Sequence, residues 1–230
     1  DADDVEDITS ICGGLNINIG TLNKNTIPSM FLAGKKANAL GHIVLLDPVG
    51  AGASRLRTDT ANRLMQEVRF DAVRGNISEI KTLCTGSGST KGVDADAVDA
   101  VTEANLDNGV QLVKTFAAQT GCIIAVTGAI DLVSDGERCW CIRNGRAEMS
   151  RITGTGCQLS ALMTAFLVAN PDRKLDAAAA AVCMMGLAGE IGWANMQPGD
   201  GNSTYRNRII DAIFNMTGDA LEEGAKYELR

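Results

Sequence analysis

Residues 42–48, His-Ile-Val-Leu-Leu-Asp-Pro, form an uncharged apolar run that ends in a carboxylate and a proline. Residues 15–19 and 122–126 are similar runs, followed by Gly20 and by Thr127. Short apolar runs bounded by turn residues are typical of buried strands. Helical patterns alternate with these runs, which predicts right-handed crossovers and an α/β fold with a mostly parallel sheet. The helical patterns cover residues 29–40, 58–68, 78–83 and 95–120.

The C-terminal part of the chain, from residue 131 on, has a different pattern. Residues 131–134 and 138–142 flank Asp135-Gly136, a turn signal, and predict a hairpin. After it we expect helices only, over residues 155–169, 175–195 and 203–224. No repeat or long linker divides the chain, so a single domain over residues 1–230 is predicted.

Composition excludes several classes of protein. The chain has 230 residues, of which 45% are hydrophobic and 21% charged, as in ordinary globular domains. A net charge of −7 leaves no basic face for nucleic acid. The apolar stretch between Asp176 and Glu190 is shorter than the about 20 residues that cross a bilayer, so we expect no membrane span. Seven cysteines without a CxxC pair, and an acidic N-terminus unlike a signal peptide, predict a reduced cytoplasmic protein.

Three glycine-rich segments are candidate anion sites. Residues 86–92 have the wrong order for a Walker A loop, because Thr90 precedes Lys91. Residues 50–55 lack the third glycine of a dinucleotide-binding loop. Residues 154–157, Gly-Thr-Gly-Cys, precede an apolar helix, whose free N–H groups would face an anion. The motif alone fits a tight turn into a core helix equally well.

Four segments together resemble hydroxyethylthiazole kinase, a thiamine-salvage family of the ribokinase-like superfamily. They are residues 47–55 (DPVGAGASR), 73–80 (VRGNISEI), 126–136 (VTGAIDLVSDG) and 153–161 (TGTGCQLSA). The resemblance implies a three-layer α/β/α ribokinase-like fold and ATP-dependent phosphorylation of the alcohol of 4-methyl-5-(2-hydroxyethyl)thiazole, with Mg²⁺, by a homotrimer. It also implies that an N-terminal segment of the family, which supplies part of the thiazole pocket, is missing here.

The resemblance assigns roles to individual residues. It implies an anion hole at the helix N-terminus, nucleotide contacts at three positions and a metal site held by two carboxylates. The sheet edge after the first strand is our candidate for the acceptor side. The anion-hole and catalytic positions are Gly154, Thr155, Gly156 and Cys157, with Gly154 also touching the substrate; the nucleotide positions are Arg74, Asn76 and Thr127; the metal positions are Asp47 and Glu79; the acceptor-side positions are Asn18, Gly20 and Thr21.

Cys157 departs from the wider superfamily, in which most members carry an aspartate as base at this position. A helix N-terminus lowers the pKa of a thiol, so a thiolate base is one hypothesis. Lining of the anion hole is the second, and burial as a small apolar residue is the third. Asp47 before Pro48 also fits a turn, and Arg74 a surface ion pair.

Two other functions stay open on the sequence. One is another ribokinase-like kinase of the hydroxymethylpyrimidine or pyridoxal type, against which residues 47–54 and 73–80 argue. The other is a non-catalytic nucleotide or thiazole sensor that has lost turnover. The retained Asp47, Asn76 and Glu79 argue against a sensor, which has no need of metal carboxylates.

Overall fold

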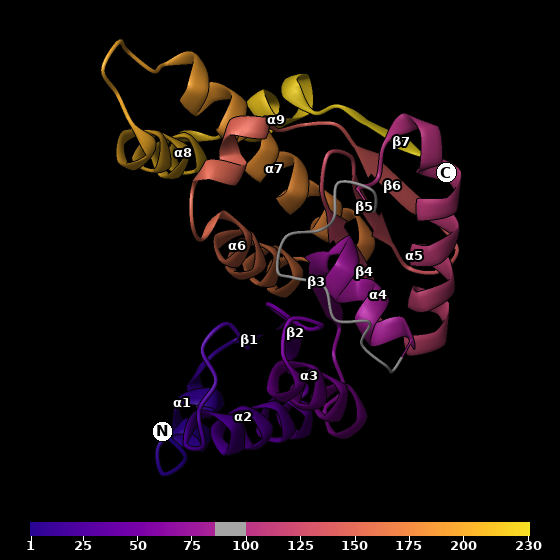
Figure 1. The fold of residues 1–230 in the computed structure, drawn as a ribbon. Coiled ribbons are helices and arrows are strands. Elements are labelled where there is room, and N and C mark those ends of the chain that lie inside the picture. Colours follow the sequence, from indigo (N-terminus) through magenta and orange to yellow (C-terminus); the bar gives the residue numbers. More distant parts are fainter. Residues whose placement is uncertain (86–99) are drawn as a thin grey trace.

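The computed structural model describes residues 1–85 and 100–230. A single sheet runs through its centre, with the strands in the same order in space as along the chain (Figure 1). The first four strands are parallel and the last three antiparallel. The strands are β1 (Gly14–Asn18), β2 (Ile43–Asp47), β3 (Ala72–Asn76), β4 (Ile123–Thr127), β5 (Asp131–Ser134), β6 (Cys139–Ile142) and β7 (Tyr227–Leu229).

Helices cover both faces of the sheet and give the predicted three layers. Side chains of a strand alternate between its faces, and here they enter two separate cores. Val44, Leu46 and Val73 pack under α2 to α5, whereas Leu45 and Ala72 pack under α6 to α8. The described α-helices are α1 (Val5–Ile11), α2 (Thr26–Leu40), α3 (Arg55–Glu67), α4 (Ile77–Thr85), α5 (Leu106–Thr120), α6 (Thr155–Ala169), α7 (Lys174–Ala194), α8 (Asn202–Asn215) and α9 (Gly218–Gly224).

The apolar runs and the hairpin are confirmed as β1, β2, β4, β5 and β6, but other expectations were wrong. Strand β3, which contains Arg74, was not among the apolar runs expected to form strands. The last segment is not purely helical, since β7 pairs with β6. The helix expected over residues 203–224 ends at Asn215, and Thr217 caps a new one by accepting from the Ala220 N–H. The helix expected from residue 95 begins at Leu106 after a 3₁₀ turn, and residues 86–99 lie outside the described part.

Helix α7 is mostly apolar. Among the described residues it is the one helix that is both long enough and apolar enough to cross a membrane. In the structure, however, 67% of its most apolar window is buried against the sheet and neighbouring helices. A core helix passes the same test, so this finding is weak support for a membrane span.

Shortening an apolar side chain should destabilise the protein most in the central strands of the sheet. Leu45 is fully buried in β2, and we expect Leu45→Ala to lower the free energy of unfolding by about 2–5 kcal/mol, through lost burial and a residual cavity. Leu56 is 53% exposed on α3, so Leu56→Ala serves as the control, with a change of about 0.5 kcal/mol or less. Urea denaturation of both variants checks this, and equal losses would contradict it.

Candidate active site

Four polar side chains occupy one face of the sheet at the carboxyl ends of adjacent parallel strands. Asn18 and Asp47 are register partners. Arg74 is the register partner of Ala125, and Thr127 lies two residues further along β4. Leu46 pairs with Val73, so Arg74 stands beside Asp47 at the next position. Because side chains alternate between the two faces of a strand, these side chains face α6, on the side of the sheet where Leu45 and Ala72 are buried.

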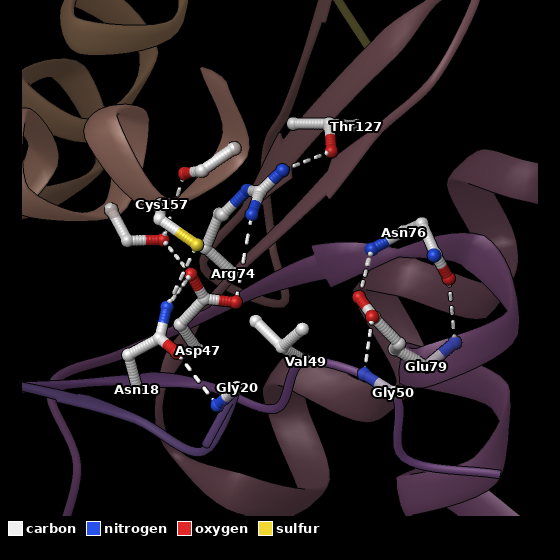
Figure 2. Close-up of polar contacts among 12 residues, drawn as sticks. Asn18, Gly20, Asp47, Val49, Gly50, Arg74, Asn76, Glu79, Thr127 and Cys157 are labelled. Atoms are coloured by element: carbon white, nitrogen blue, oxygen red, sulfur yellow. Dashed lines mark hydrogen bonds and ion pairs between the residues drawn. The ribbon is translucent and has the colours of Figure 1, made fainter. Parts of the chain in front are cut away.

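Asp47 is the buried centre of this cluster (Figure 2). Its Oδ2 accepts hydrogen bonds from Asn18 Nδ2 and Ser160 Oγ, both at 2.8 Å. Its Oδ1 has no hydrogen-bond partner and lies 3.5 Å from Arg74 Nη1. Burial raises the pKa of the Asp47 carboxyl above its usual value, against the opposing effects of Arg74 and the two hydrogen bonds. Asp47 is therefore more than a turn residue before Pro48.

Arg74 is likewise buried, and its guanidinium lies against the first turn of α6 (Figure 2). Its Nη2 donates to Thr127 Oγ1 at 2.8 Å, and its Nε has no partner. A Cβ added at Gly156 would stand 2.7 Å from Nη2, so only glycine leaves room for this approach. The alternative of a surface ion pair is wrong for Arg74.

Cys157 lies in the first turn of α6, which begins at Thr155 after Gly154 with φ +97°. The thiol is exposed, so the hypothesis of simple burial is wrong. Its Sγ accepts a hydrogen bond from Asn18 Nδ2 at 3.1 Å, and the same nitrogen donates to Asp47. The thiol therefore stands at the helix N-terminus, beside a buried carboxylate and an amide donor.

Glu79 and Asn76 form a second unit at the start of α4. Asn76 Oδ1 accepts from the Glu79 N–H, and Glu79 Oε2 accepts from the Asn76 N–H, both at 2.8 Å, as in a capping box. Glu79 Oε1 accepts from the Gly50 N–H at 2.8 Å. Burial raises the pKa of Glu79, although these backbone donors oppose the shift. The Asn-x-x-Glu motif thus orders the loop after β2.

The acceptor-side candidates differ in their placement. Asn18 belongs to the Asp47 cluster, and the Gly20 N–H holds its Oδ1 at 2.7 Å. This bond fixes the amide so that Nδ2 faces Asp47 and Cys157. Thr21 is exposed, and no contact joins it to the cluster within the part of the chain described.

Two residues of the site were not predicted. Ser160, which binds Asp47, lies one turn after Cys157 on α6, so helical spacing could have indicated it. Asp131 lies at the start of β5, and its Oδ1 accepts from the Gly128 N–H at 2.8 Å, which holds the loop after Thr127. No sequence signal beyond its turn position pointed to Asp131.

The carboxylates of the site suit a divalent cation that is shared with substrate phosphates. Among residues 1–85 and 100–230, no three His, Cys, Asp or Glu side chains gather as a dedicated cage. Mg²⁺ needs none, because it binds through one or two carboxylates together with substrate phosphates and waters. The free Oδ1 of Asp47 suits this arrangement. Both Glu79 oxygens already accept backbone N–H bonds, so Glu79 fits as a partner of metal-bound water.

A groove elsewhere on the molecule does not compete for this role. It lies between β6, α7 and α9, has a volume of about 400 Å³ and is lined by residues such as Trp140, Cys183 and Tyr227. None of the clustered polar residues lines it. The cluster at the sheet end is the better candidate, because convergent buried polar groups mark reaction sites.

Residues 1–219 match the model of the hydroxyethylthiazole kinase family. The chain belongs to this family. It is 55% identical over 228 residues to a hydroxyethylthiazole kinase of Clostridium acetobutylicum, covering 99% of this chain and 84% of that one. It is 43% identical to a hydroxyethylthiazole kinase of Ruminiclostridium cellulolyticum, covering 98% and 81%.

Solved structures agree with this membership. A hydroxyethylthiazole kinase structure from Pyrococcus horikoshii superimposes with a TM-score of 0.85 at 28% identity, covering 99% of this chain and 81% of that one. A Staphylococcus aureus pyridoxal kinase in complex with ADP gives 0.64 at 19% identity, covering 99% and 77%. The second likeness concerns the fold alone. Together the two structures confirm the ribokinase-like α/β/α fold expected from the sequence.

Asp131 gives this family member a testable pH dependence. Burial raises the pKa of Asp131 to about 7 from its ordinary value of 3.8, against the opposing effects of the Gly128 N–H and Arg74. Its contribution to stability is complete below the ordinary value and is lost as the pH rises through about 7. Asp131→Asn keeps an acceptor and cannot ionise, so its stability relative to the parent protein should increase from pH 5 to pH 8. Urea denaturation at several pH values checks this, and a constant difference would contradict it.

Proposed function

We propose that the protein transfers the γ-phosphoryl group of ATP to the hydroxyl of 4-methyl-5-(2-hydroxyethyl)thiazole, in thiamine salvage. Family membership supports the reaction, and the kinase family implies ATP as the donor. One structural observation carries the proposal: the Arg74 guanidinium is packed against the N-terminus of α6. A cation beside the positive end of a helix strengthens the attraction of that end for an anion. A transferring phosphoryl group is such an anion.

The charge of this group is stabilised by groups already in place. The free N–H groups of Gly154, Thr155, Gly156 and Cys157 begin α6 and form the anion hole. Arg74 adds a planar donor, and its unpartnered Nε is available to a phosphate oxygen. Positioning and charge stabilisation supply most of the catalysis in phosphoryl transfer.

On the nucleotide side, Arg74, Thr127 and Asn76 would contact the phosphates of ATP. Asp47 would hold Mg²⁺ through its free oxygen, with Glu79 acting through a bound water. When bound, Mg²⁺ would supply charge that offsets the negative charge of the phosphates. Arg74 and Ser160 keep Asp47 oriented toward this position.

On the acceptor side, the alcohol would lie over Gly154 and Cys157, bordered by Asn18, Gly20 and Thr21. The hydroxyl oxygen bonds to phosphorus, ADP departs, and the hydroxyl proton leaves to a base or to water. Cys157 would either accept that proton or line the anion hole. Asn18 supports both roles, because its amide donates to Sγ.

The test is ADP release with purified protein, ATP and a panel of thiazole, pyrimidine and pyridoxal alcohols, with and without Mg²⁺. We expect Mg²⁺-dependent turnover that is greatest with the thiazole alcohol. Preference for a pyrimidine or pyridoxal alcohol would overturn the substrate. Binding of ATP and thiazole without turnover would favour the sensor.

We further propose that residues 1–230 act as a single kinase domain in the cytoplasm and assemble as a homotrimer. Exposed apolar side chains such as Ile11, Phe214 and Leu229 leave surface for a subunit contact. A monomeric mass in light scattering, with full activity, would overturn the trimer.

Neutralising either carboxylate should lower both turnover and stability, for different reasons. Asp47→Asn leaves the buried Arg74 guanidinium without its charge partner, so it should lower the free energy of unfolding and lower kcat by about 10²-fold or more. Glu79→Gln also leaves one backbone N–H without its acceptor, so it should lower both kcat and the free energy of unfolding, the latter by about 1–3 kcal/mol. Kinetics over a range of Mg²⁺ concentrations and urea denaturation check both, and unchanged turnover in both variants would contradict the assignment.

Substitution of Cys157 separates its two roles. If the thiol is the base, Cys157→Ala should lose about 10²-fold in kcat, and Cys157→Asp should retain activity, because Asn18 already offers a donor there. If only the backbone N–H matters, Cys157→Ala should remain active. We expect an intermediate loss for Ala and tolerance of Asp, measured at saturating ATP and thiazole. Cys12→Ala is the control, because Cys12 precedes the amino end of β1, opposite the end that carries the site. A folded but inactive Cys157→Asp together with a fully active Cys157→Ala would exclude the thiol as base.

A further inference from the structure

Arg57 makes two contacts that the site's own chemistry does not account for. It lies in the first turn of α3, where its N–H donates to the cap residue Ser54. Its Nη2 donates to the Gly20 carbonyl at 2.7 Å, and its Nη1 donates to the Val49 carbonyl at 3.0 Å. One rigid guanidinium therefore joins the loop after β1 to the loop after β2.

Each of these loops orients one half of the candidate site. In the first loop, the Gly20 N–H holds Asn18, whose amide binds Asp47 and Cys157. In the second loop, the Gly50 N–H, directly after Val49, binds Glu79 (Figure 2). In the second loop Arg57 thus binds the same peptide unit whose N–H binds Glu79, and in the first loop it binds the peptide unit that follows the Gly20 N–H.

The packing around the guanidinium is specific to this arrangement. Gly50 has φ +73°, and a Cβ there would collide with Arg57 Nη1. The backbone of the second loop can approach the guanidinium this closely only because residue 50 is glycine. A lysine could not reproduce the contact, because a single ammonium lacks the planar fork that reaches two carbonyls in fixed geometry.

We propose that Arg57 is a positioning residue, which holds the loops after β1 and β2 in register and so orients Asn18 and Glu79 for the reaction. Arg57 touches neither substrate nor metal in this proposal. Its effect passes through backbone atoms to the acceptor side and to the carboxylate of α4. The kinetic part rests on the proposed function, whereas the ordering of the two loops does not.

The same helix turn provides a matched control. Arg55 is two residues earlier, carries the same charge and has 94% of its side chain exposed. Within residues 1–85 and 100–230, its one ion pair is with Asp59 at 3.4 Å. Arg57→Gln and Arg55→Gln therefore remove the same charge from the same turn. Arg57→Lys keeps the charge and removes the fork.

Hydrogen exchange read by mass spectrometry tests the ordering of the loops without any substrate. In Arg57→Gln we expect exchange to rise about 10-fold in peptides covering residues 18–22 and 48–52, with peptides of α8 unchanged. Arg57→Lys should give a smaller rise and Arg55→Gln none. Unchanged exchange in folded Arg57→Gln, or an equal rise in α8, would overturn the proposal, since the latter indicates global destabilisation.

Steady-state kinetics test the consequence for the reaction. Arg57→Gln should lower kcat by about 10–100-fold, the scale of a misplacement near 1 Å, and raise the KM for the thiazole alcohol. The KM for ATP should rise less than the KM for the thiazole alcohol, because the Arg74–Thr127 hydrogen bond on the nucleotide side does not involve Arg57. A kcat and a KM for the thiazole alcohol that are both unchanged in Arg57→Gln would overturn the positioning role. If the parent protein itself does not phosphorylate the thiazole, the proposed function fails, and the exchange result still decides the role of Arg57 in the loops.

Discussion

The pairing of Asp47 with Arg74 is the interaction on which the rest of the site depends. Both side chains are buried at the ends of adjacent strands, where neither ion could remain alone without a large desolvation cost. Their geometry is imperfect as an ion pair, because Oδ1 and Nη1 are 3.5 Å apart. The surrounding Asn18, Ser160 and Thr127 complete the hydrogen bonding and hold the pair in place. The pair thus retains unused donor and acceptor capacity.

Helix α6 adds a second electrostatic constraint. Its positive end lies over Arg74, so an anion placed there would be attracted by both. Gly156 permits this approach, and any side chain there would force the guanidinium away. The helix and the guanidinium thus favour the same position for a phosphate.

The predictability of the fold and site from sequence follows from the same features. Strands β2 and β4 were visible as uninterrupted apolar runs and β1 by its alternation, whereas β3 was hidden because it carries Arg74 and Asn76, two polar residues of the site. Strand β7 has only three residues, with Tyr227 and Leu229 exposed. Arg57 and Arg55 look alike in the sequence, and only the tertiary position of the two loops distinguishes them.

The order of the strands has a consequence for folding. Each strand pairs with the next one along the chain, so the sheet can grow from β1 to β6 by successive local additions. The site cannot form in this way, because α6 must return to β1 and β2 across separations of 139 residues for Cys157 and Asn18 and 113 for Ser160 and Asp47. Closing so long a loop comes late and costs chain entropy. We therefore expect the reaction centre to be the last part of the parallel half to assemble, with α6 closing both the site and the core that it shares with β2.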